Sequence, residues 1–242
     1  MSRTVVVTGG GKGIGRAIVE RFAALGDDVV ALGRDQRALE ELDVRTAVCD
    51  VTDEQAVTDT FKQLSRVDVL VNNAGIAETA PLAKTTLASW GRHFDVNVTG
   101  SFLCTRAVVP GMRERGRGAV VFVVSTAGRI GRPYTSAYTA SKHAAVGLMR
   151  AVASELAGSG VRVNAVCPTF VRTELTDRAI ARIVERTGRT EAESRAALVG
   201  MSPLGRLLNA EEVAEAVVFL ASDAALAISG QTLVIDGGGI QS

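Results

Sequence analysis

The sequence predicts an α/β protein built on one doubly wound parallel sheet of seven strands. Short apolar runs alternate with longer segments of helical periodicity, which is the order of elements in sheets whose strands are joined by crossover helices. The runs are apolar at successive positions, as expected for strands that helices cover on both faces. With 242 residues and 47% hydrophobic content, the chain fits a single domain over residues 1–242.

The predicted elements follow one another along the chain. The apolar runs predict strands at residues 4–8, 29–32, 46–49, 67–71, 119–124, 161–166 and 232–235. Capping-box patterns predict three helix starts, at Thr52 with Gln55, at Thr190 with Glu193 and at Asn209 with Glu212. Residues 172–208 interrupt the alternation of strands and helices, and we expect them to form a small helical lid.

Composition excludes several classes of function. The 27 basic and 26 acidic residues leave a net charge of +1, so no overall field attracts nucleic acid or an anionic membrane. No apolar run approaches the roughly 18 residues of a membrane-spanning helix, and the N-terminus lacks the pattern of a signal peptide. We therefore expect a cytoplasmic protein with neither a nucleic-acid nor a membrane partner.

Cysteine and histidine are too sparse for a metal centre. The three cysteines are far apart in the sequence, which suits a reducing compartment and offers neither a disulfide framework nor a zinc spacing. The two histidines, His93 and His143, are interpreted as ordinary helix residues. The sequence thus predicts no metal site.

A glycine-rich loop follows the first strand. Residues 8–15 read TGGGKGIG and precede a helical pattern that runs through Leu25. Glycines let the backbone approach a pyrophosphate, whose charge the amides and the dipole at the start of the helix can bind. A tight turn alone would explain the glycines, but the strand before and the helix after favour a dinucleotide site.

The end of the second strand indicates which dinucleotide binds. NAD-specific sites usually carry an acidic residue there, whereas this chain has Gly33 followed by Arg34. A guanidinium can bind the 2′-phosphate of NADP(H), and Lys12 in the glycine loop supplies a second cation. Alternatively both are solvated surface charges, with Asp35 partly neutralising Arg34. We expect NADP(H), with NAD(H) left open.

Tyr138 and Lys142 are spaced four residues apart. In a helix both side chains then lie on one face and can reach one cleft. A neighbouring cation favours the phenolate and should lower the pKa of the tyrosine, which makes it a proton donor at neutral pH. The alternative is a buried aromatic residue beside a lysine with an exposed head.

These motifs together resemble the short-chain dehydrogenase/reductase family, over residues 4–239. The resemblance rests on the glycine loop, on the segment NNAG at 72–75, and on Asn97, Ser125 and the Tyr138/Lys142 pair in that order. It implies a Rossmann-type fold and four catalytic residues. Tyr138 would be the general acid in carbonyl reduction, Lys142 would lower its pKa and bind the nicotinamide ribose, Ser125 would polarise the substrate oxygen, and Asn97 would kink its helix and anchor a proton-relay water.

The resemblance also implies a set of cofactor-binding residues. Asp50 and Val51 match the pair that contacts the adenine, and Thr173 matches the threonine that binds the nicotinamide carboxamide. Thr169 stands where the family commonly has a glycine. With Tyr138 and Lys142, the expected set is Gly9, Lys12, Gly13, Ile14, Gly15, Arg34, Asp50, Val51, Asn73, Ala74, Gly75, Pro168, Val171 and Thr173.

Only similarity within the family narrows the choice of substrate class. Segments 141–147 and 163–168 resemble bacterial ketoreductases that act on fatty-acyl or polyketide β-keto thioesters. Reductases for carrier-protein substrates tend to have a basic residue shortly before the sixth strand, where this chain has Ser159. We expect a 3-oxoacyl reductase-like enzyme acting on an acyl-CoA or acyl carrier protein thioester. An NAD-dependent alcohol or sugar dehydrogenase and a non-catalytic dinucleotide sensor remain as alternatives.

Two further expectations concern the lid and the assembly. The lid carries Arg172, Arg178, Arg182 and Arg186, which either favour an anionic substrate or form a solvated face paired with Glu174, Asp177 and Glu185. We prefer the solvated face. The family resemblance implies a homotetramer built through helices at 86–113 and 138–157 and the segment 230–242.

Overall fold

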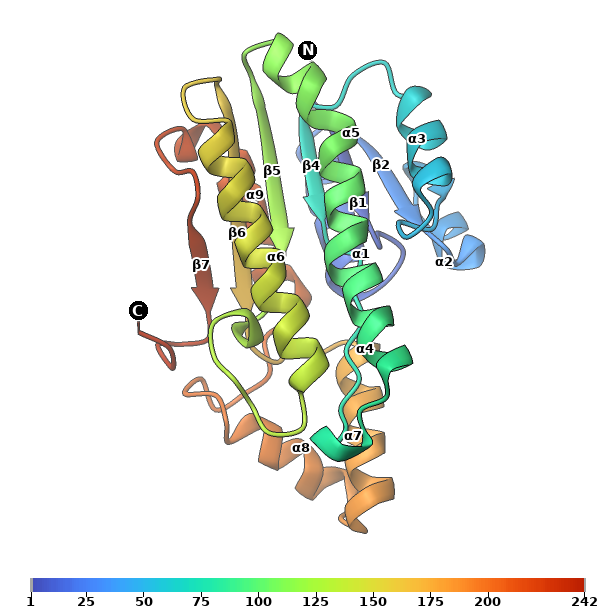
Figure 1. Ribbon diagram of the computed structural model, residues 1–242, viewed down its shortest axis with the longest axis vertical. Helices are drawn as coiled ribbons and strands as arrows, with labels where there is room; N and C mark the ends of the chain where they lie inside the picture. The colour runs from blue at the N-terminus through green and yellow to red at the C-terminus, as the bar shows by residue number, and fades with distance from the viewer. Residues whose placement is uncertain (1, 242) are drawn as a thin grey trace.

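One seven-stranded parallel sheet organises the protein (Figure 1). This computed structural model describes residues 2–241. The strands are β1 (Thr4–Thr8), β2 (Asp28–Gly33), β3 (Arg45–Val48), β4 (Val69–Asn72), β5 (Gly118–Val123), β6 (Val161–Pro168) and β7 (Thr232–Ile235). All pairings are parallel and the order is β3-β2-β1-β4-β5-β6-β7. The winding reverses between β1 and β4, and a crevice opens beyond the carboxyl ends of strands at such a switch point.

Helices cover both faces of the sheet, as the sequence predicts. They are α1 (Gly13–Ala24), α2 (Gln36–Glu40), α3 (Glu54–Lys62), α4 (Leu87–Phe94), α5 (Gly100–Glu114), α6 (Ser136–Glu155), α7 (Glu174–Thr187), α8 (Glu191–Val199) and α9 (Ala210–Ala221). A π-helical turn at Asp95–Thr99 joins α4 to α5, and 3₁₀ turns form at Leu82–Lys84, Thr126–Gly128 and Asp223–Ala225. In Figure 1 the helices α5 and α6 lie in front of the sheet, with α1 and α9 behind it.

The two faces of the sheet have separate cores. In β5, Val120 and Phe122 are buried in the cluster that includes α3, α5 and α6. Ala119 and Val121, at the intervening positions, belong to the cluster that includes α1 and α9. Because successive side chains of a strand point to opposite faces, only a strand apolar throughout can serve both cores.

The predicted helix starts hold at two positions of three. Thr190 begins α8 with a complete capping box with Glu193, and Glu212 accepts the backbone N–H of Asn209 (2.8 Å) at the start of α9. The prediction at Thr52 is wrong. Asp53 caps α3 instead, because the Thr52 hydroxyl donates to Asp50 (2.8 Å) and is not available to the helix.

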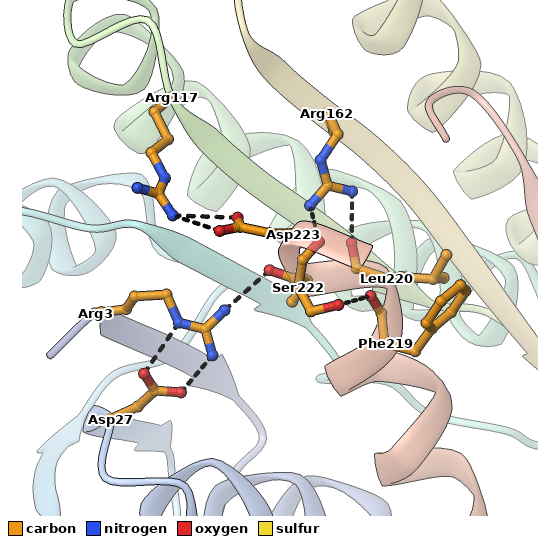
Figure 2. Close-up of polar contacts among 9 residues, drawn as sticks. Arg3, Asp27, Arg117, Arg162, Phe219, Leu220, Ser222 and Asp223 are labelled. Atoms are coloured by element: carbon orange, nitrogen blue, oxygen red, sulfur yellow. Dashed lines mark hydrogen bonds and ion pairs between the residues drawn. The ribbon is translucent and has the colours of Figure 1, made fainter. Parts of the chain in front are cut away.

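Three arginines converge on the end of α9 at the amino-terminal edge of the sheet (Figure 2). Arg162 is 8% exposed and donates to the carbonyls of Leu220 (2.6 Å) and Ser222 (3.0 Å). Arg3 donates to the carbonyl of Ala221 (3.0 Å), and Arg117 pairs with Asp223 (3.2 Å). The last carbonyls of a helix lack partners within it and carry negative partial charge, so these cations stabilise the end of α9.

Residues 172–208, which we expect to form the lid, lie beyond the carboxyl ends of the strands. The lid consists of α7 and α8, which occupy the lower end of the molecule in Figure 1, toward which the strand arrows point. An isolated bridge between Val171 and Leu208 closes its base. Within residues 2–241, the structure contains no helix with the length and apolar character needed to span a membrane.

Candidate active site

Three adjoining cavities run along the carboxyl edge of the sheet. The first, of about 290 Å³, lies between the glycine loop and the ends of β2 and β3. The second, of about 270 Å³, continues past Gly9 and Gly75 to Tyr138 and Lys142. The third, of about 170 Å³, shares Tyr138 and Thr173 with the second and extends under the lid. The arrangement has the form of an extended cofactor cleft that meets a small substrate cavity at Tyr138.

The glycine loop is shaped for close approach of a phosphate. Gly9 and Gly13 adopt left-handed φ values of 65° and 52°, which favour glycine. A Cβ on Gly15 would lie 2.1 Å from the Gly9 carbonyl oxygen, so only glycine fits there. The side chain of Asn73 donates to the carbonyls of Thr8 (2.9 Å) and Gly9 (3.1 Å) and holds the loop against β4.

The start of α1 is open toward this cleft. Its N-cap residue, Lys12, makes no side-chain capping bond, so the first N–H groups of the helix are not satisfied by the usual capping side chain. Gly13, Ile14 and Gly15 all line the second cavity. These residues fit the pyrophosphate of a dinucleotide.

Ion pairs surround the expected 2′-phosphate site. Lys12 pairs with Asp35 (2.8 Å), and Arg34 lies 3.6 Å from Asp50. Asp35 therefore neutralises Lys12, not Arg34 as the sequence suggested. The hydrogen bond between them raises the pKa of Lys12 and lowers that of Asp35. All four residues line the first cavity with Gly33 and Val51, so the predicted adenosine contacts lie together.

Tyr138 and Lys142 project from one face of α6, as their spacing predicts. The Lys142 ammonium lies 5.9 Å from the centre of the Tyr138 ring and donates to the carbonyl of Val123 (3.1 Å). Ser125 lies two residues after the end of β5, and its hydroxyl oxygen accepts the N–H of Ala127 (3.1 Å). Ser125 and Tyr138 line the substrate cavity, whereas Lys142 lines the cofactor cleft.

The electrostatics of the pair differ from the prediction. Burial disfavours the phenolate and raises the pKa of Tyr138, although the neighbouring Ser125 hydroxyl acts in the opposite direction. Burial also disfavours the ammonium and lowers the pKa of Lys142 to about 8. The expected lowering of the Tyr138 pKa is therefore wrong, because desolvation of the phenol outweighs the opposing effect of Ser125.

Asn97 lies in the π-helical turn, so the predicted irregularity of its helix is confirmed. Its side chain accepts the N–H of Ile76 (2.8 Å) and donates to the Ile76 carbonyl (3.1 Å) and to the Ser141 hydroxyl (2.9 Å). A Cβ on Gly75 would lie 3.1 Å from the Asn97 oxygen and 3.5 Å from the Lys142 nitrogen. Asn97 thus ties the segment after β4 to α6, next to Lys142.

The remaining predicted cofactor-binding residues, at the end of β6 and just after it, do not all line the same cavity. Thr173 caps the start of α7, lies beside Gly13 and lines both the cofactor cleft and the substrate cavity. Pro168 and Val171 line only the substrate cavity. Thr169 has no left-handed φ and its N–H donates to the Ile235 carbonyl (3.0 Å), so the backbone there does not require the usual glycine.

Sequence reasoning missed several residues of the site. His93 is fully buried, donates from Nδ1 to the Ser89 carbonyl (2.7 Å), accepts the N–H of Glu78 (3.0 Å) and packs edge-on against Tyr138. Arg132 and Phe170 line the substrate cavity. Helical periodicity predicts burial of His93 but not its neighbours, and Arg132 lies in a loop without periodic signal. No group of three His, Cys, Asp or Glu suited to a metal ion occurs in the part of the chain that the structure describes.

The fold and this site define a dinucleotide-dependent oxidoreductase of the short-chain class. A family model described as enoyl-(acyl carrier protein) reductase matches residues 9–239. The chain belongs to the short-chain dehydrogenase/reductase family.

Its relatives act on different substrates. The chain is 38% identical to an acetoacetyl-CoA reductase of Rhizobium meliloti, over 98% of each protein. It is 41% identical to a galactitol 2-dehydrogenase (L-tagatose-forming) of Cereibacter sphaeroides, over 96% of this chain and 92% of that one. A crystal structure of an actinorhodin polyketide ketoreductase variant with NADPH superposes with a TM-score of 0.92 at 33% identity, over 98% of this chain and 97% of that one.

Proposed function

We propose that this protein reduces a ketone to a secondary alcohol with NADPH, and that the ketone is a β-keto acyl thioester. The observation that carries the proposal is the junction at Tyr138, which lines both the cofactor cleft and the substrate cavity. A carbonyl held there by Ser125 would be next to a proton donor and next to the nicotinamide end of the cleft. When bound, NADPH would supply the hydride.

The chain's own residues would handle the proton. Tyr138 would donate its hydroxyl proton to the carbonyl oxygen, with Ser125 hydrogen-bonding to the same oxygen, so that hydride plus proton gives the alcohol. Lys142 would stabilise the phenolate that remains, and the segment ordered by Asn97 would hold Lys142 in position. The reverse sequence would oxidise an alcohol.

The choice of NADPH rests on Arg34 and Lys12 at the adenosine end of the cleft. Their carboxylate partners are surface groups, and a bound 2′-phosphate can exchange with such partners at small cost. The same ion pairs favour the second candidate function, an NAD-dependent alcohol or sugar dehydrogenase, since they leave fewer unpaired cations for a 2′-phosphate.

A panel assay tests both candidates. Ketones, β-keto thioesters and sugar alcohols are offered with NADPH, NADH or their oxidised forms, and absorbance of the reduced cofactor is followed. Turnover of β-keto thioesters with at least tenfold preference for NADPH supports the proposal. Preference for NADH or NAD⁺ would overturn the choice of cofactor, and wild-type turnover by Tyr138→Phe would remove Tyr138 from the mechanism.

We also propose that the protein is a cytoplasmic homotetramer. All three cysteines are free and buried, which suits a reducing compartment. Phe102 on α5 is 40% exposed, an apolar surface on one of the helices expected in the interface. Sedimentation velocity at micromolar concentration measures the assembly, and a monomer would contradict it.

A further inference from the structure

A fourth cavity, of about 300 Å³ and with a polar lining, lies beside the substrate cavity. The two cavities share Thr79 and Arg182. Its walls come from residues 78–92, from residues 134–137 and from α7, so it forms where the lid meets the segment before and within α4. Residues of both α4 and α7 line it, and Figure 1 shows both helices in the lower half of the molecule.

Positive charge dominates this cavity. Its lining holds four cations, Lys84, Arg92, Arg182 and Arg186, and one carboxylate, Glu78. The carboxylate is already engaged, because it accepts hydrogen bonds from Ser89 (2.9 Å) and Arg92 (3.0 Å). Three positive charges therefore remain without an acidic partner among the residues that line the cavity.

Two of these cations have open donor positions. Within residues 2–241, no hydrogen bond or ion pair engages the Lys84 ammonium or the Arg182 guanidinium, and Arg186 uses one nitrogen to bind the Thr79 carbonyl (2.8 Å). Elsewhere in the lid the predicted solvated pairing does occur: Arg178 pairs with Glu174 (3.0 Å), whereas Asp177 binds Arg195 (3.1 Å). The preference for a solvated arginine face thus holds for Arg178 and fails for Arg182, which turns to the cavities.

Backbone strain is concentrated at the same place. Tyr134 is the one residue other than glycine with a left-handed φ (66°) in the described part of the chain. It is 65% exposed and lines this cavity. Its carbonyl accepts the N–H of Ala80 (2.9 Å), which ties the loop before Tyr138 to the cavity wall. Strain of this kind persists where the surrounding structure maintains it, and it concentrates at binding sites.

We propose that this basic cavity binds an anionic group of the substrate, with Arg182 as the residue that reaches it from the substrate cavity. The inference rests on the proposed reduction at Tyr138 and names the class of its substrate: a ketone with a carboxylate, sulfonate or phosphate. A guanidinium with free donors binds such oxyanions in bidentate geometry. The anion is either a short extension of the ketone or a phosphate of a coenzyme A thioester.

Matched substrate pairs test the inference. Acetoacetate and 5-oxohexanoate are compared with their methyl esters, and acetoacetyl-CoA with the acetoacetyl thioester of N-acetylcysteamine. In the wild type the anionic member of the relevant pair should have the higher kcat/KM. Arg182→Gln should lower that value about tenfold, the effect of one charge-assisted hydrogen bond, and leave the neutral member unchanged. Arg182→Lys should restore part of the loss because it keeps the charge.

The pattern across pairs identifies the source of the anion. Sensitivity of the keto acids indicates a short anionic ketone, and sensitivity of acetoacetyl-CoA alone indicates a coenzyme phosphate. Arg189→Gln is the control, because Arg189 also belongs to the lid region but lines neither cavity. Equal effects of Arg182→Gln on anionic and neutral members, or none on either, would overturn the inference.

A second measurement separates this inference from the proposed reduction. The shift in Tm caused by each keto acid or by coenzyme A is measured in wild type and in Arg182→Gln without cofactor. Stabilisation of the wild type that the variant loses would support the anion site even if no ketone is reduced. Equal shifts in both proteins, or no shift with any of these anions, would refute it whatever the activity.

Discussion

Replacing Lys142 by methionine should make the protein more stable and less active. Lys142 is 5% exposed, and burial lowers the pKa of its ammonium from 10.5 to about 8. By linkage, keeping this lysine charged in the folded state costs about 3 kcal/mol at pH 7. Methionine removes that cost and also the hydrogen bond to Val123, which is worth about 1 kcal/mol. We therefore expect Lys142→Met to raise the free energy of unfolding by about 2 kcal/mol at pH 7.

The gain should disappear as the pH rises. Between the folded pKa of about 8 and the unfolded pKa of 10.5, the unfolded chain binds more protons at Lys142 than the folded one, so wild-type stability increases with pH through this group. By pH 10 the wild type should have recovered about 2 kcal/mol, and the two proteins should be about equally stable. Other groups titrate in both proteins and cancel in the difference.

Urea unfolding followed by the fluorescence of Trp90 at pH 7, 8, 9 and 10 measures this difference. Lys62→Met is the control, because Lys62 is exposed and its replacement should change stability by less than about 0.5 kcal/mol at every pH. Turnover by Lys142→Met should fall by about a hundredfold or more, the usual value of a group that controls proton transfer. A variant less stable than the wild type at pH 7, or a gain that does not change with pH, would refute the reasoning.

Three further predictions concern the structure around the site. Arg162→Ala should lower the free energy of unfolding by about 2 kcal/mol in the same urea titration, because it removes the cap of α9 (Figure 2). Arg117→Ala breaks only an exposed ion pair and should lower it by less than about 1 kcal/mol. Equal losses in the two variants would contradict this account. Gly15→Ala should weaken NADPH binding at least about tenfold in a fluorescence titration, because its Cβ would lie 2.1 Å from a backbone oxygen. A Cβ on Gly131 would meet no atom within 4 Å, so Gly131→Ala should bind NADPH as the wild type does. Asn97→Asp loses two hydrogen-bond donations and should reduce kcat about tenfold or more; a wild-type kcat would show that Lys142 needs no such support.

Much of the fold could be predicted because its signals are local. The first and last strands, Thr4–Thr8 and Thr232–Ile235, match the predicted ranges fully, and the other five shift by one or two residues at an end. Continuous apolar runs between turn residues fix a strand to within a few positions. The helix start at Thr52 failed for an equally local reason: Asp50 competes for the threonine hydroxyl, and Asp53 caps the helix in its place.

The residues that form the site could also be predicted from the sequence, but the shifts of their pKa values could not. The glycine loop, Ser125 and the Tyr138/Lys142 pair can be found because each lies at the end of a strand or at helical spacing. Whether the pKa of Tyr138 rises or falls depends on how completely the rest of the fold removes water from the phenol and from Lys142. Desolvation by segments far away in the sequence has no signal in a spacing of four residues.

By itself, the sequence determined the doubly wound sheet, the dinucleotide loop and the order of the reactive side chains, because hydrophobic periodicity and backbone geometry act over a few residues. Only the tertiary structure decided which charges are neutralised. It pairs Lys12 with Asp35, caps α9 with Arg162 from β6, and brings Lys84 of the segment before α4 into the same cavity as Arg182 of the lid. Charges interact through space, so their partners are known only when distant segments of the chain have been brought together.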